Sequence, residues 1–186
     1  MTVEEIFEKI IHHQIKGLMI HEQFASYYDF LGLKGSRKCH EYHYLDESIG
    51  FRATMHYMIS HYNKLVPDTP IDAPKMIPEN WYNYTRDDVD INTKRNAIKQ
   101  AMESWKEWET STKKLYEDMY MELLRLDDVA GALFIKNLIC DVTHELKKVQ
   151  QYCLNLKAVD YDMVYIIEKQ DEIHHKFKCK ISELFK

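Results

Sequence analysis

Acidic residues and histidines recur at positions where helical periodicity turns them toward a protein interior. A helix advances about 100° per residue, so residues three or four apart share a face. One carboxylate in each of four apolar-striped segments lies at or beside its apolar face, with two histidines of the second segment as nitrogen donors: Glu22, Glu47, Glu109, Glu145, His40 and His43. Carboxylates and imidazoles together suit iron or manganese, and a buried cluster of acids needs a cation to offset desolvation and mutual repulsion. The pattern therefore favours a metal site built from core carboxylates.

Asp141 and His144 have the spacing of a carboxylate-x-x-His pair, with Asp in the place of Glu. On a helical wheel, however, His144 projects almost opposite the apolar face of its helix, so this pair would need a kink in the helix to face the interior. Chance remains an alternative explanation for the whole set. The chain has 30 Asp and Glu residues, and one of them near each apolar stripe is also expected at random.

Five amphipathic helices are predicted to position these residues, at about 3–31, 36–65, 93–126, 129–157 and 161–185. The first carries a stripe of Phe7, Ile11, Ile15, Leu18 and Ala25, and the third one of Ile98, Ala101, Trp105, Thr112, Tyr116, Met119 and Leu123. Gly32 and Gly35 separate the first two helices, and Pro67 ends the second. All four prolines fall within the connection 66–92. No strand and no tandem repeat is predicted.

The order of these elements indicates the architecture. Two helices joined tightly, a long connection, and two more helices joined tightly form one recurring kind of four-helix bundle. The connection 66–92 must then run along the bundle as a crossover. A length of 186 residues favours a single domain. The predicted fold class is therefore all-α.

Three stretches resemble the ferritin-like superfamily: HEQFASYYDF (21–30), NAIKQAMESWKEWE (96–109) and FIKNLICDVTHELKK (134–148). The first is similar to a first-helix pattern in which a metal-binding Glu is followed three residues later by Ala-Ser-Tyr, and Glu22 matches that Glu. The order of elements resembles this superfamily over most of the chain. The resemblance implies a ferritin-like four-helix bundle with a long crossover between the second and third helices, an extra C-terminal helix, and a di-metal iron or manganese centre for oxidation or storage chemistry.

The second predicted helix departs from the metal-binding pattern of this superfamily. Its di-iron members take one Glu from each of two helices and a Glu-x-x-His pair from each of the other two. Here Glu47 is followed at the required offset by Gly50 rather than by His. A ferritin-like bundle without a metal is therefore the alternative, and the sequence leaves open whether the protein is an enzyme.

A non-catalytic binding module is a second function class. A short, acidic, Tyr-rich helical chain without a catalytic motif is typical of inhibitors encoded by phages or mobile elements, for example one that occupies the basic groove of a nucleic-acid-binding nuclease such as a CRISPR effector. Acidic clusters such as Asp87–Asp88 and Asp127–Asp128 would then form the contact surface. A Dps-like or encapsulated oligomer is a third alternative.

The second helix also carries a second apolar line, formed by Tyr42, Leu45, Ile49 and Ala53. A helix that is apolar on two faces must cover both of them. Either the terminal helix or the crossover packs there, or the line is a homodimer or partner interface.

Composition and short motifs argue against several other classes of protein. The acidic start MTVEEIFEKIIHH is not a secretory signal, so we expect a cytoplasmic protein, and no apolar run approaches the roughly 18 residues of a membrane span. Four cysteines without a CxxC pair do not suggest a zinc knuckle or a redox dithiol. A net charge of −5 argues against direct nucleic-acid binding. Without a GxSxG motif or a phosphate-cradling glycine loop, enzyme classes outside metal-carboxylate chemistry are unsupported.

Overall fold

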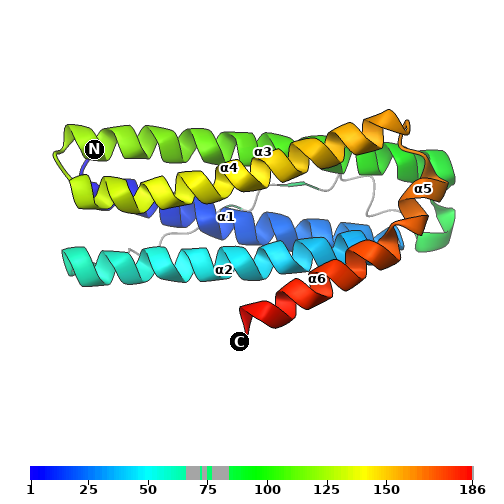
Figure 1. Ribbon diagram of the computed structural model, residues 1–186, viewed down its shortest axis with the longest axis horizontal. Helices are drawn as coiled ribbons and strands as arrows, with labels where there is room; N and C mark the ends of the chain where they lie inside the picture. The colour runs from blue at the N-terminus through cyan, green and yellow to red at the C-terminus, as the bar shows by residue number, and fades with distance from the viewer. Residues whose placement is uncertain (66–71, 73–74, 77–83, 186) are drawn as a thin grey trace.

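The computed structural model describes residues 1–65, 72, 75–76 and 84–185, and the regular structure of these residues is helical. Four long helices lie side by side in Figure 1: α1 (Val3–Phe30), α2 (Lys34–Tyr62), α3 (Ile91–Arg125) and α4 (Val129–Ala158). A 3-10 turn, η2 (Arg86–Asp88), precedes α3, and α5 (Met163–Glu168) and α6 (Gln170–Leu184) follow α4. This arrangement confirms the predicted all-α bundle with an extra C-terminal helix. Most of the predicted crossover 66–92 lies outside the described residues.

Helices α1 and α2 pack as one hairpin, and α3 and α4 as another. Polar side chains fix where these helices begin. Thr2 and Glu5 form a reciprocal capping box at the start of α1, and Asp90 accepts two backbone N–H bonds at the start of α3. Among the described helices, none has an apolar stretch long enough to cross a bilayer.

Asp128 ties the two hairpins together at one end of the bundle. Its Oδ1 accepts the backbone N–H of Gly131 at 2.9 Å and so caps α4, while its Oδ2 accepts the hydroxyl of Tyr62 at 2.6 Å. Tyr62 is the last residue of α2. This acid therefore has a structural role, which the sequence-based contact-surface hypothesis for Asp127–Asp128 did not foresee.

Gln170 ties the chain together at the other end, where it caps α2 from across the sequence. The residue before α2, Leu33, makes no side-chain cap, and the backbone N–H groups of Gly35 and Ser36 donate instead to Gln170 Oε1 at 2.9 and 3.0 Å. A Cβ on Gly35 would lie 2.3 Å from the Gln170 carbonyl oxygen. Only glycine permits so close an approach.

The predicted terminal helix 161–185 is divided at Lys169 into α5 and α6, which point in different directions in Figure 1. Helix α6 then packs along α2, and the rings of Tyr42 and Phe177 lie 5.6 Å apart. The terminal helix thus covers the first part of the second apolar line of α2. Ile49, further along that line, remains 49% exposed, and Ala53 is exposed as well.

The apolar core consists of two separate clusters. One gathers around Phe24, Tyr28, Trp105, Val149 and Phe177, near the start of α2. The other gathers around Phe7, Ile10, Met58, Leu123 and Ile135, near the end of α2. The middle of the bundle, between the two clusters, is where the candidate ligands lie.

Periodicity predicted the inner face of α3 correctly and that of α1 only in part. All seven residues predicted for the α3 stripe are buried. On α1 the predicted Phe7, Ile11 and Ala25 are buried, but between them the buried positions run through Gln14, Gly17 and His21, whereas Ile15 and Leu18 are only partly buried. The inner face in the middle of α1 is therefore rotated by about one residue from the predicted one.

We expect Gly35→Ala to destabilise the fold by about 1–3 kcal/mol, the usual cost of inserting a methyl group into a closely packed site. The added Cβ must push the Gln170 backbone away and disturb the cap of α2. Chemical denaturation measures the free energy of unfolding. Gly50→Ala is the matched control, because a Cβ there meets only the side-chain nitrogen of Gln14 at 3.8 Å. Equal stability of the two variants would contradict this account.

Candidate functional site

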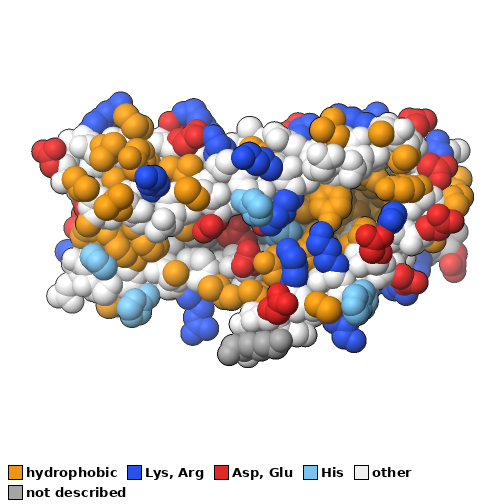
Figure 2. Space-filling model, in the orientation of Figure 1, with side chains coloured by type: hydrophobic (Ala, Val, Ile, Leu, Met, Phe, Trp, Pro, Cys, Tyr) orange, Lys and Arg blue, Asp and Glu red, His pale blue; other side chains and the backbone are white. Residues whose placement is uncertain are grey.

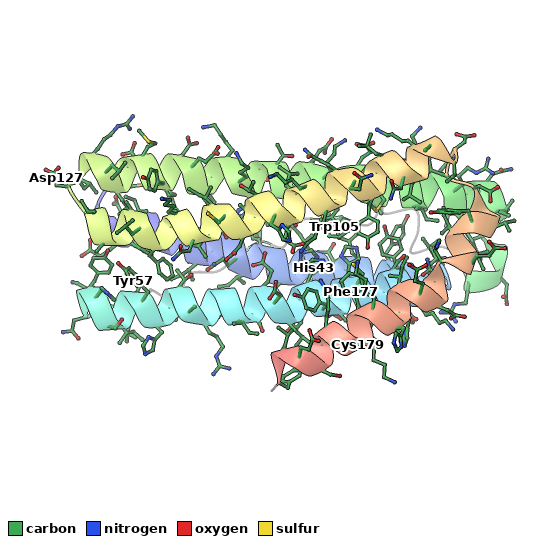
Figure 3. The ribbon with its side chains drawn as sticks, viewed as in Figure 1. His43, Tyr57, Trp105, Asp127, Phe177 and Cys179 are labelled. Atoms are coloured by element: carbon green, nitrogen blue, oxygen red, sulfur yellow. The ribbon has the colours of Figure 1, made fainter. Side chains whose placement is uncertain are left out.

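A layer of polar side chains crosses the middle of the bundle, between the two apolar clusters. Three imidazoles and one carboxylate in it are buried: His21 on α1, His40 and His43 on α2, and Glu109 on α3. Figure 3 shows His43 on α2 and Trp105 on α3 lying close together between their helices, and their rings are 5.3 Å apart. We call this set, with Glu47 and Glu145, the polar layer.

A cavity of about 580 Å³ lies against this layer. Figure 2 shows acidic side chains in the recess between α2 and α4 where the cavity meets the surface. The residues of the polar layer that line it come from four helices: His21, His43, Glu47, Glu109 and Glu145. The cavity therefore brings together side chains that lie up to 124 residues apart in the sequence, from His21 to Glu145.

The two most deeply buried histidines hold each other in place. His21 Nδ1 and His40 Nδ1 lie 3.1 Å apart in a hydrogen bond, so one of the two nitrogens carries the proton. This bond leaves His21 Nε2 facing Glu109 Oε1 at 4.0 Å. The same oxygen of Glu109 accepts the indole N–H of Trp105 at 2.9 Å.

Glu145 and Glu47 complete the layer. His43 Nδ1 lies 3.6 Å from Glu145 Oε2, a buried oxygen that has no hydrogen-bond partner in the described part of the chain, while Glu145 Oε1 accepts a bond from Lys148 at 2.7 Å. The carboxyl carbon of Glu47 would be 3.4 Å from a Cβ on Gly17. The Glu47 carboxylate therefore lies close to the backbone of α1 at Gly17, inside the bundle.

Burial shifts the acids of the layer toward their neutral forms. It raises the pKa of Glu47 to about 8, and the nearby Glu109, Asp46 and Glu145 add to this rise. Burial also raises the pKa of Glu109 to about 7, although the hydrogen bond from Trp105 acts in the opposite direction. Two of the carboxyl groups in the layer thus resist ionisation in the absence of a cation.

Burial shifts the histidines toward their neutral forms as well. The pKa of His43 falls to about 3, mainly through desolvation and further through Lys148 and Lys180. Desolvation also places the pKa of His21 and that of His40 well below the ordinary value. Neutral imidazole is the form that binds metal ions.

Glu22 does not belong to the layer, and its predicted inward position is wrong. Its side chain is exposed on α1, whereas the adjacent His21 is buried. Adjacent helical residues point about 100° apart, so the one-residue rotation of α1 exchanges them. His21 is the functional candidate that the sequence analysis missed, and its spacing of four from Gly17 and three from Phe24 was the available signal.

The other predicted ligands divide into two groups. Glu47, Glu109, Glu145 and His43 line the cavity as expected, and His40 lies behind His21. Asp141 and His144 are exposed and reach only the cavity rim, so this pair does not enter the layer. Among the described residues, no group of three or more His, Cys, Asp or Glu side chains is placed to hold a metal ion in its present conformation.

The fold matches ferritins of known structure. An open-pore ferritin from the hyperthermophilic archaeon Archaeoglobus fulgidus has a TM-score of 0.77 at 16% sequence identity, over 92% of this chain and 95% of that chain. An engineered closed form of the A. fulgidus ferritin and a humanized archaeal ferritin both match with a TM-score of 0.77 at 16% identity, over 92% of this chain and 94% of theirs. The chain has a ferritin-like fold. No protein-family model matches the sequence of this ferritin-like bundle, and neither does any curated protein.

His13 lies near the polar layer of the ferritin-like bundle, on α1. Its ring stacks on Trp108 with centroids 4.2 Å apart, and its Nε2 forms a 2.7 Å hydrogen bond with the hydroxyl of Thr112, a residue of the cavity wall. Burial lowers the pKa of His13 to about 4, and the charge of Lys16 adds to this effect.

We expect this histidine to destabilise the fold in acid. Because the pKa in the folded state lies below the unfolded value of about 6.5, the unfolded chain binds the proton first, and stability falls as the pH drops from about 6.5 to 4. His13→Phe keeps an aromatic ring but loses the hydrogen bond to Thr112. It should cost about 1 kcal/mol at pH 7.5 and become the more stable protein, by roughly 1–2 kcal/mol, near pH 4.

Denaturation curves between pH 4 and 8 measure this crossover. His56→Phe, at an exposed position of α2, is the control, and its difference from the parent should not change sign. A constant difference between His13→Phe and the parent over the whole range would refute the expectation.

Proposed function

We propose that this ferritin-like bundle binds one divalent transition-metal ion, iron or manganese, in the cavity of the polar layer. The observation that carries the proposal is the buried Glu145 Oε2, which has no hydrogen-bond partner among the described residues and belongs to a cavity wall that also contains His21, His43, Glu47 and Glu109. A buried polar atom without a partner costs on the order of 1–3 kcal/mol. A bound cation would supply that partner.

The donor chemistry fits such an ion. Imidazole nitrogens combined with carboxylate oxygens suit iron and manganese. Two donors on one ion lie about 3–4 Å apart, since each metal–donor bond measures about 2.0–2.2 Å. The pairs His43–Glu145 at 3.6 Å and His21–Glu109 at 4.0 Å fall in this range. Binding requires side-chain rotation within the cavity, because no three donors converge among the described residues.

The two-metal centre implied by the ferritin resemblance fits less well. Gly50 stands where its Glu-x-x-His pair needs a histidine, and the exposed Glu22 cannot act as its first-helix ligand. Asp141 and His144 lie at the exposed rim. The donors that do face the cavity favour a single ion.

The residues of the layer would have different roles in metal binding. His21, His43, Glu109 and Glu145 would bind the ion, with Glu47 as a further carboxylate, and the bound ion would supply the positive charge that these acids lack. His40 would hold the His21 ring through the 3.1 Å bond between their Nδ1 atoms, which leaves His21 Nε2 facing the cavity. Such outer partners fix the orientation of metal-binding imidazoles.

Glu109→Gln and Glu145→Gln should each weaken binding of Mn²⁺ or Fe²⁺ at least tenfold, about 1.4 kcal/mol, because an amide donates no charge to the ion. Anaerobic calorimetric titration and elemental analysis of protein from metal-supplemented cells measure this. Glu22→Gln is the control and should leave the affinity unchanged, since Glu22 is exposed away from the layer. No metal at one equivalent in the parent, or loss of metal on Glu22→Gln alone, would overturn the proposal.

Gly50→His should raise the affinity for the metal roughly tenfold, because it restores a Glu-x-x-His pair with Glu47 on the cavity wall. The site has room for a side chain, since a Cβ on Gly50 meets only Gln14 Nε2 at 3.8 Å. Gly50→Ala adds the Cβ without a nitrogen donor and should not change the affinity. Equal affinities of Gly50→His and Gly50→Ala, measured by the same titration, would show that the metal ion does not bind next to position 50.

A further inference from the structure

A second cavity lies next to the polar layer, in the cleft between α4 and α6. Helix α6 packs on α2 but makes no extended contact with α4, and Figure 1 shows α6 diverging from α4 toward the C-terminus. The cavity has a volume of about 350 Å³, which is within the usual range for small-molecule sites.

The wall of this cavity is largely apolar. Residues of all six α-helices form it, His40 of the polar layer among them, and its apolar side chains include Ile98, Met102, Trp105, Leu156, Ile166 and Ile173. In Figure 2 hydrophobic side chains gather between α4 and α6, and Lys and Arg side chains lie along the edge of this patch. An apolar cavity of this kind favours a ligand with a hydrocarbon body.

Two lysines of α6 lie beside the cleft. Lys176 lines this cavity and also a neighbouring cavity of about 340 Å³, whose wall includes Lys180 and Lys148. Neither Lys176 nor Lys180 makes an ion pair with a described residue, whereas Lys148 is paired with Glu145. The ammonium of Lys176 lies 5.5 Å from the ring centre of Phe177 and 3.5 Å from the hydroxyl of Tyr152.

Lys180 has a similar aromatic setting. Its ammonium lies 4.8 Å from the ring centre of Tyr42 and 5.2 Å from that of Phe177. Lys176 and Lys180 are one helical turn apart, so both side chains lie on the same face of α6. Aromatic faces stabilise these ammonium groups but do not neutralise them.

We propose that the cleft binds an amphipathic carboxylate, a single-chain fatty acid of medium length. Its hydrocarbon chain fills the apolar cavity, and its carboxylate is held by Lys176 and Lys180. The net charge of the chain is −5, so the protein as a whole does not attract anions. Binding of an anion here would depend on the local charges of Lys176 and Lys180 and on the fit of the hydrocarbon chain to the cavity. The inference is independent of metal binding, because it uses a different cavity.

Isothermal titration of the whole protein with dodecanoate, below its micelle concentration, tests the proposal. We expect binding with one-to-one stoichiometry, at least tenfold weaker binding of dodecanol, and no binding of acetate. Dodecyl phosphate carries the same chain with a different anion and should bind no more tightly than dodecanoate. A dodecyl phosphate affinity tenfold higher would overturn the assignment of the ligand as a carboxylate.

Variants locate the site. The double variant Lys176→Gln with Lys180→Gln should weaken dodecanoate binding at least tenfold, and the charge-matched control Lys9→Gln with Lys99→Gln, at exposed positions, should not. Asn155→Trp, at an exposed position shared by this cavity and the neighbouring one, should block binding without a change of charge. No binding by the parent, dodecanol as tight as dodecanoate, or unchanged affinity in both the double variant and Asn155→Trp would each overturn the proposal.

Discussion

The constraint on which the structure depends is the burial of a polar layer across the middle of the bundle. Imidazoles and carboxylates are expensive to remove from water unless they are hydrogen-bonded or paired. Hydrogen bonds within the layer, His21–His40 and Trp105–Glu109, offset part of this free-energy cost. Protonation offsets another part, since burial raises the pKa of Glu47 to about 8. Glu145 Oε2 has no hydrogen-bond partner among the described residues, and the metal site proposed above is based on this atom.

The polar layer also divides the apolar core, so each half of the bundle needs its own contacts that hold its helices together at that end. At one end the Tyr62 hydroxyl donates to Asp128 and joins the end of α2 to the start of α4. At the other end Gln170 accepts the N–H groups of Gly35 and Ser36 and joins α6 to the start of α2. Both connections join segments far apart in the sequence. These contacts therefore hold the two apolar clusters in one bundle, although the polar layer separates them.

The sequence predicted the helices and their order because these depend on strong local signals. The α3 face was predicted correctly because charged residues fill its outer side, so its apolar stripe is unambiguous. The α1 face was predicted correctly at its two ends but not in its middle, because Ile15 and Leu18 flank the inner line through Gln14 and Gly17, and a one-residue rotation hardly changes the periodicity. That rotation was enough to exchange His21 for Glu22. The bond between His21 and His40, and the cap from Gln170, depend on tertiary contacts and have no local signature.

The position of α6 relates the polar layer to the neighbouring cleft. Because Gly35 lets α6 begin directly against α2, the helix follows α2 and leaves α4, and Phe177 comes to lie 6.1 Å from the His43 ring. The same helix thus shields the polar layer from solvent on one side and opens an apolar cleft on the other, with Lys176 and Lys180 beside it. His43 and Trp105 also line the neighbouring cavity of about 340 Å³, together with Lys176 and Lys180. This ferritin-like bundle thus has both a cavity lined by polar residues of the four long helices and a largely apolar cavity where the added helix diverges from α4.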